Sequence, residues 1–140
     1  MISGIAVPPP PADREVNATS AGIDKNGNGV RDDVERLLAT AYGADAKAFA
    51  GAMKMAARMQ TILAPTSIDR DTVQAIVVAG VNDARCNTDA NFKGNLLAAS
   101  RANQVVMAAA LNTVERVALY QARLSLASAV VPIDVQKACS

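Results

Sequence analysis

Apolar residues recur every three or four positions along most of the chain after residue 31, which is the spacing of helices that bury one face. The pattern predicts four to five helices, with expected bounds of 32–42, 44–63, 67–81, 88–111 and 112–128. The last two are separated because Asn112 and Glu115 have the spacing of a capping box. The alternative is one long helix that continues through Asn112.

Proline and small polar residues mark the expected boundaries between these helices. Pro65 is expected to end the second helix, and Thr66 or Ser67 is expected to cap the third. Residues 82–87, which include Cys86, are interpreted as a loop between the third and fourth helices because most of them are polar or small.

Residues 1–22 lack the helical pattern and contain four consecutive prolines from Pro8 to Pro11, which favour an extended polyproline conformation. We therefore expect a flexible Pro-rich arm over residues 1–22, followed by a single helical domain over residues 23–140. A spacer between a lipid anchor and the domain is a rival interpretation of the arm, and so is a proline-rich ligand for a partner domain.

The core must be built from aliphatic side chains, because 51% of the residues are hydrophobic, only 3% are aromatic and Trp is absent. Small aliphatic residues favour closely packed helices, so the predicted fold class is an all-α bundle. The net charge is +1 without a basic stripe among stacking aromatics, which argues against nucleic-acid binding. The absence of histidine excludes His-based catalytic triads and His metal ligands.

The two cysteines of the chain, Cys86 and Cys139, lie in no CxxC motif. An even number of isolated cysteines suits a disulfide formed in an oxidising compartment. A bridge across a chain segment of this length would stabilise the folded state by about 4 kcal/mol in the chain-entropy description. The alternative is two buried thiols in a cytosolic protein.

One segment has a residue pattern that specifies a chemistry. Oxygen-bearing side chains alternate from Asp24 to Asn28, Gly29 follows, and Glu35 closes the segment. Calcium prefers about six to eight oxygen ligands, which such a wrapped segment can supply. The expected calcium ligands are the side chains of five residues and the backbone carbonyl of a sixth, Val30: Asp24, Asn26, Asn28, Val30, Asp32 and Glu35.

The segment from Asp24 to Glu35 resembles the calcium loop of EF-hand proteins, and as a single loop it is similar to those of dockerins. The resemblance implies that Gly29 allows a sharp turn, that Asp32 binds the ion directly or through water, and that Glu35 contributes both carboxylate oxygens.

Two features depart from the EF-hand pattern. Arg31 occupies the position where EF-hands have an aliphatic residue, and no helical pattern precedes Asp24. Because two ligands are neutral amides and because Lys25 and Arg31 add opposing charge, we expect a dissociation constant of about 10⁻⁵ to 10⁻³ M, towards the extracellular range.

Calcium and a disulfide together favour the periplasm or the exterior of a bacterial cell. No catalytic motif is present, so the expected protein is non-catalytic, stabilised by calcium and active through protein–protein contact. An inhibitor or immunity protein of a secreted or periplasmic enzyme is the favoured example. The alternatives are a structural envelope lipoprotein, with an N-terminal lipid anchor outside this sequence, and a small hydrolase that uses carboxylates. Met1 is interpreted as the start of an already processed chain.

Overall fold

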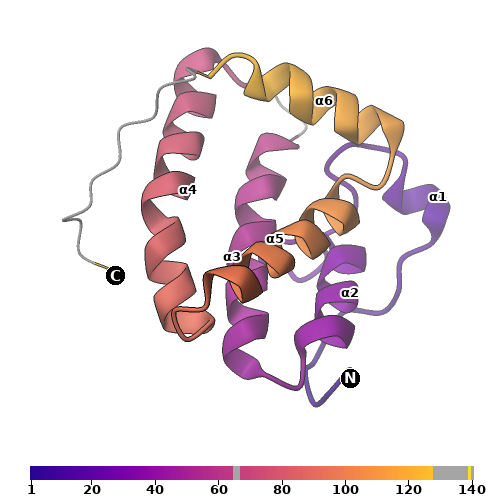
Figure 1. The fold of residues 1–140 in the computed structure, drawn as a ribbon. Coiled ribbons are helices and arrows are strands. Elements are labelled where there is room, and N and C mark those ends of the chain that lie inside the picture. The colour runs from indigo at the N-terminus through magenta and orange to yellow at the C-terminus, as the bar shows by residue number, and fades with distance from the viewer. Residues whose placement is uncertain (65–66, 128–138, 140) are drawn as a thin grey trace.

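The computed structural model describes residues 1–64, 67–127 and 139, and these residues form helices without any strand (Figure 1). The predicted all-α class is therefore confirmed for the described part of the chain. The helices are α1 (Asp13–Val16), α2 (Asp32–Tyr42), α3 (Ala46–Ile62), α4 (Arg70–Asn91), α5 (Leu96–Ala110) and α6 (Val114–Leu124).

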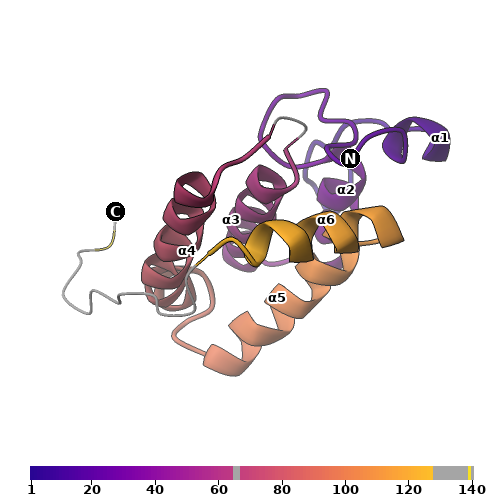
Figure 2. The same ribbon diagram turned by 90° about the horizontal axis from the view of Figure 1, so that it is seen from above.

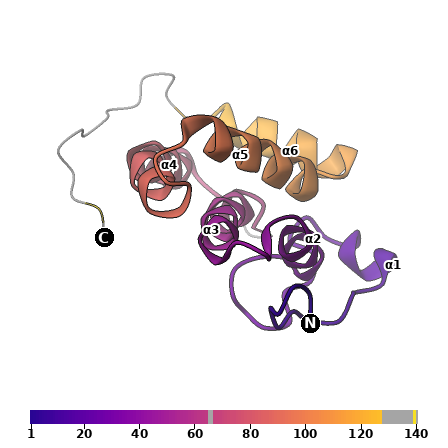
Figure 3. The ribbon, with the colours of Figure 1, turned by 60° about the horizontal axis from the view of Figure 1, so that its bottom comes forward.

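The main helices are arranged in two layers. Figure 3 shows α2, α3 and α4 nearly end-on in one layer, with α5 and α6 laid across them. The central helix α3 packs against α2, α4 and α5. The consecutive helices α4 and α5 are splayed apart, as the view in Figure 2 shows. This splay leaves a cleft between the two helices, which is described below.

The core lies where α2, α3 and α5 meet. Leu38 of α2 and Val106 of α5 are fully buried there, and Ala52 and Ala56 of α3 lie between them. Alanines at these positions allow the helix backbones to approach closely. Helix α3 carries a glycine for the same reason, because a Cβ atom on Gly51 would lie 2.5 Å from the ring of Phe92.

The predicted loop over residues 82–87 is wrong, because α4 runs without interruption from Arg70 to Asn91. The polar residues of this stretch have partners on α3: Asp83 accepts a hydrogen bond from Arg58 at 3.1 Å, and Asn87 donates to the Gly51 carbonyl at 3.2 Å. These polar positions are therefore surface positions of a helix. The cap of α4 is Asp69 rather than Thr66 or Ser67. Pro65 and Thr66 lie outside the described residues.

The break between α4 and α5 comes later than predicted, so the expected helix start near residue 88 is also wrong. Lys93 and Gly94 have left-handed backbone conformations, with φ of 54° and 70°, and they turn the chain. Asn95 then caps α5 by accepting a hydrogen bond from the Ala98 amide. The predicted break near Asn112 is confirmed.

The residue that caps α6 is Thr113, whose hydroxyl accepts from the Arg116 amide at 3.1 Å. The side-chain oxygen of Asn112, expected to take part in a capping box, accepts from two arginine side chains instead. A cap by the neighbouring threonine leaves that oxygen available for the arginines.

The N-terminal segment, expected as a flexible arm over residues 1–22, contacts the bundle at defined positions. Arg36 of α2 donates to the Pro8 carbonyl at 2.8 Å, and Gln60 of α3 donates to the Ala21 carbonyl at 2.8 Å. The side chain of Val16 is buried. The segment thus runs along the helices before the chain enters the predicted calcium loop.

The predicted pair of cysteines lies at disulfide distance. The Cα atoms of Cys86 and Cys139 are 5.4 Å apart, within the range that a disulfide requires. Cys86 is on α4 and not in a loop, so the bridge links Cys139 near the end of the chain to α4.

Candidate metal centre

The predicted calcium loop begins with a tight turn that is organised by Asp24. Its carboxylate accepts hydrogen bonds from the backbone amides of Gly29 at 2.9 Å and Asn28 at 3.3 Å, so the chain wraps around it. Gly27 and Gly29 have φ values of 66° and 84°, which favour glycine. The prediction that Gly29 allows a sharp turn therefore agrees with the backbone.

Glu35, the last predicted ligand of the loop, lies in the first turn of α2 and is 5% exposed. Its two carboxylate oxygens accept hydrogen bonds from the side-chain amides of Asn26 at 3.1 Å and Asn28 at 2.9 Å. The first turn of α2 thus places Glu35 against the loop that precedes the helix. Three of the residues predicted as ligands are hydrogen-bonded to each other at this point.

The remaining predicted ligands have different surroundings. Both carboxylate oxygens of Asp32 lie 3.2 Å from the backbone amide of Lys25, and the Asp32 amide donates to the Ile23 carbonyl at 2.7 Å. The side chain of Val30 is buried in the core between α2, α3 and α5. Asp32 and Val30 therefore fix the loop to the domain.

The donor types of the loop fit calcium, because carboxylate and amide oxygens are hard ligands. Within the described ranges of the chain, no three His, Cys, Asp or Glu side chains form a metal-binding group. The three predicted carboxylate ligands, Asp24, Asp32 and Glu35, are therefore not gathered into one group in this structure. Asn26 and Asn28 turn their Nδ2 atoms toward Glu35, while their Oδ1 atoms accept from backbone amides, so coordination of an ion together with Glu35 would require both side-chain amides to rotate.

Arg31, in the middle of the loop, is the residue whose role the sequence did not reveal. Its side chain is 0% exposed. It forms a two-point ion pair with Asp33, with distances of 2.6 and 2.8 Å. It also donates to the carbonyls of Ala109 and Ala110 in the last turn of α5, at 3.0 and 3.1 Å. Arg31 therefore connects the loop to the end of α5.

A second buried arginine, Arg116 of α6, lies beside this ion pair and is 1% exposed. It donates to the carbonyls of Val16, Thr19 and Ser20. Burial and the neighbouring charge of Arg31 lower the pKa of the Arg116 guanidinium from its usual value. The Asp33 carboxylate and the backbone and side-chain oxygens that accept from the two arginines offset the cost of burying two like charges.

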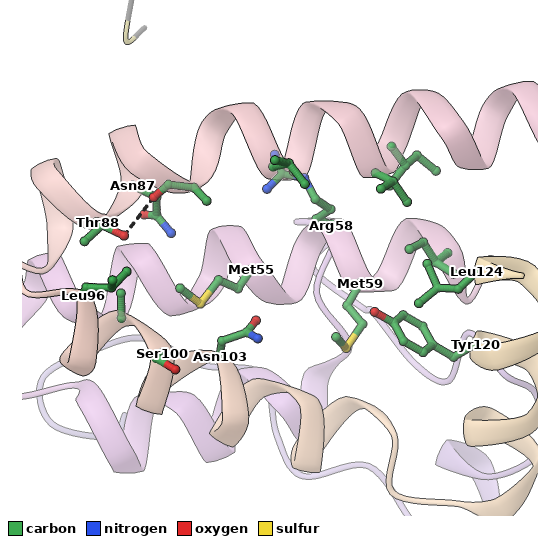
Figure 4. A pocket seen from close by; sticks show the side chains of 17 residues that line it. Met55, Arg58, Met59, Asn87, Thr88, Leu96, Ser100, Asn103, Tyr120 and Leu124 are labelled. Atoms are coloured by element: carbon green, nitrogen blue, oxygen red, sulfur yellow. Dashed lines mark hydrogen bonds between the residues drawn. The ribbon is translucent and has the colours of Figure 1, made fainter. Parts of the chain in front are cut away.

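The cleft between the splayed helices has a volume of about 500 Å³. Figure 4 shows Met55 and Met59 of α3 along one side of it, with Tyr120 and Leu124 of α6 at one end. Burial raises the pKa of the Tyr120 hydroxyl, which points toward Met59 in this view. None of the described residues that line this cleft carries a carboxylate. Leu96, at its other end, is 74% exposed.

Comparisons with known proteins give no relative: no protein-family model, no curated protein and no solved structure matches the chain. Among the described helices, none combines the length and the apolar character that crossing a bilayer requires.

Proposed function

We propose that residues 24–35 bind a calcium ion and that this ion stabilises the domain. The observation that carries the proposal is that the side-chain amides of Asn26 and Asn28 converge on Glu35, while the backbone amide of Asn28 donates to Asp24. The ligands would be the side chains of Asp24, Asn26, Asn28, Asp32 and Glu35 with the Val30 carbonyl. A bound ion would supply positive charge next to the acidic first turn of α2, where Asp32, Asp33 and Glu35 lie.

The proposed ion has a structural role. Its loop joins the N-terminal segment to α2, and Val30 in the same loop packs into the core. An ion that binds only the folded state raises the free energy of unfolding by about 2.7 kcal/mol at a concentration of 100 times its dissociation constant. Calcium concentrations outside the cytosol are high enough for a site of modest affinity to be filled.

We further propose that the protein is non-catalytic, works in the periplasm or outside the cell, and acts by binding another protein. The cysteine pair at disulfide distance supports an oxidising compartment. Leu96 and Leu97 are 74% and 60% exposed at the end of the cleft, and adjacent exposed leucines are typical of contact surfaces. An inhibitor or immunity protein of a secreted or periplasmic enzyme remains the favoured example.

The alternatives differ in what they require. A structural envelope lipoprotein would need a lipid anchor and no enzyme target. A hydrolase that uses carboxylates would need paired acidic side chains in a cleft, and the residues described around the cleft between α4 and α5 include none. Because these residues include no paired acidic side chains, the hydrolase is the weakest of the three proposals.

Thermal unfolding followed by circular dichroism at 222 nm in calcium, in magnesium and in chelator tests the calcium site. We expect the melting temperature to rise by several degrees in calcium alone. Glu35→Gln should abolish this rise, whereas Glu15→Gln, which removes an exposed carboxylate from α1, should keep it. Three coincident curves for the wild-type protein would refute the proposed site.

The proposed contact surface is tested by co-purification from cells of the source organism. We expect the wild-type protein and Leu37→Asp, which changes an exposed leucine on α2, to retain the same protein partner. Leu96→Asp should lose that partner. If Leu96→Asp retains it as well as the wild-type protein does, the surface beside the cleft is not the contact site.

A further inference from the structure

Arg31 lies between two of the proposed calcium ligands along the chain, Val30 and Asp32. It is also the residue directly before α2, where its backbone is not helical and its side chain makes no capping hydrogen bond. Any change in the loop backbone on ion binding therefore moves the base of this side chain. In paired EF-hand loops this position contacts the partner loop, but here the side chain reaches the end of α5 instead.

The last carbonyls of a helix have no partner within the helix, and a cation there is favoured by the helix dipole. Arg31 supplies both the donors and the charge at the end of α5. Its Nη2 atom also donates to the side-chain oxygen of Asn112, at 3.2 Å, in the turn that follows α5. The corner between α5 and α6 is thus held by a residue of the calcium loop.

The same Asn112 oxygen accepts a second hydrogen bond, from Nη1 of Arg116 at 2.9 Å. Arg116 in turn donates to the side chain of Asn17, at 3.1 Å, and to the carbonyl groups of its neighbours in the N-terminal segment. A continuous set of hydrogen bonds therefore runs from the loop through Asn112 to the segment over residues 16–20.

We propose that Arg31 couples calcium binding in the loop to the α5–α6 corner and, through Asn112 and Arg116, to residues 16–20. This inference rests on the calcium site proposed above and specifies what that site regulates. A filled loop holds Arg31 in place, and Arg31 then holds the ends of both helices. Because α5 and α6 form two sides of the cleft beside α4, the ion also steadies the walls of that cleft.

The test compares the wild-type protein with Arg31→Met, which keeps most of the buried side-chain volume and removes the guanidinium. Calcium affinity is measured by isothermal titration calorimetry, and amide hydrogen exchange of residues 105–120 and 16–20 is measured by mass spectrometry with and without calcium. We expect calcium to slow exchange at these residues by about fivefold or more in the wild-type protein, as for a typical coupling. In Arg31→Met this slowing should be lost, and by linkage the affinity should fall by the same factor.

Arg36→Met is the matched control, because Arg36 lies nearby in the first half of α2 but donates to the Pro8 carbonyl instead of the end of α5. It should bind calcium and respond like the wild-type protein. Asn112→Ala provides a milder variant in case Arg31→Met does not fold. It should keep the calcium response of exchange in the last turn of α5 and lose the response at residues 16–20.

The possible outcomes separate the two proposals. A wild-type protein that shows no calcium binding in the calorimeter refutes the proposed site and with it the coupling. A wild-type protein that binds calcium without slower exchange at residues 105–120 refutes the coupling alone. The same conclusion follows if Arg31→Met, or Asn112→Ala at residues 16–20, responds like the wild-type protein.

Discussion

Gly22 lies directly over the side chain of Arg31: a Cβ atom on Gly22 would be 2.7 Å from Cγ of Arg31 and closer still to Cδ. Gly22 also has a φ of 63°, a conformation that side chains rarely adopt. Gly22, which lies just before the proposed calcium loop, therefore leaves room for the buried side chain of Arg31. A residue with a Cβ atom at this position would clash with the arginine and would hold this conformation only with strain.

We predict that Gly22→Ala lowers the free energy of unfolding by about 1–3 kcal/mol from backbone strain, and by more where Arg31 is displaced. Gly4→Ala is the control, because Gly4 has a φ of 80° but nothing within 4 Å of its added Cβ atom. Urea unfolding in chelator measures both without a contribution from calcium. Equal losses for the two variants would show that the contact with Arg31 is unimportant.

Asp24→Asn should separate the two roles of Asp24, which are to organise the turn and to bind the ion. The amide that replaces the carboxylate keeps an oxygen that can accept from the Gly29 amide, so stability in chelator should change little. The charge is lost, so the gain in calcium should shrink well below the roughly 2.7 kcal/mol expected for a filled site. Chemical unfolding with and without calcium measures both quantities, and an undiminished gain would remove Asp24 from the ligands.

Gly51→Ala is expected to destabilise the protein, although the same change within a helix usually stabilises it by about 1 kcal/mol. The added Cβ atom would lie 2.5 Å from the Phe92 ring and 2.9 Å from Cβ of Asn91, in a packed junction. The comparison is Gly80→Ala on α4, where the nearest atom is Cδ of a flexible side chain, Arg58, at 2.8 Å. Melting temperatures should fall for Gly51→Ala and stay or rise for Gly80→Ala; the reverse order would contradict the packing described here.

The buried hydroxyl of Tyr120 should make the free energy of unfolding depend on alkaline pH. Burial raises its pKa above the ordinary value of 10.0, so the folded state keeps the hydroxyl proton while the unfolded state releases it. The contribution of this group is thus fully present below about pH 10 and is lost as pH rises through the raised folded value. Tyr120→Phe should show a smaller loss of stability above pH 10. Identical pH profiles for the two proteins in urea unfolding would contradict this prediction.

The helices that the sequence predicted well are those whose buried face is continuous. Helix α2 has the expected bounds, because Val34 and Leu38 lie on one face at helical spacing. The middle of α4 was missed because Asn82 and Asn87 resemble loop residues, and only their contacts in three dimensions show them to be on a helix. The local signal that marks the true break between α4 and α5 is Gly94, which follows Lys93 in a left-handed turn.

The sequence likewise predicts one part of the candidate site and misses another. The proposed calcium ligands all come from one short segment, so the local pattern from Asp24 to Glu35 is enough to propose them. From the sequence, Arg31 is expected only to add a positive charge near the proposed ion. Its burial depends on Ala109, Ala110 and Asn112, which are about eighty residues away in the chain, and no local pattern specifies such contacts.

The hydrogen bonds from Arg116 to residues 16–20 limit where the protein can be shortened. A fragment that starts at Ile23 retains the whole proposed calcium loop and every helix from α2 onward. It would nevertheless lose the carbonyls of Val16, Thr19 and Ser20, to which the Arg116 guanidinium donates. The minimal folding unit therefore begins before Val16, and an affinity tag or fusion partner belongs upstream of that residue.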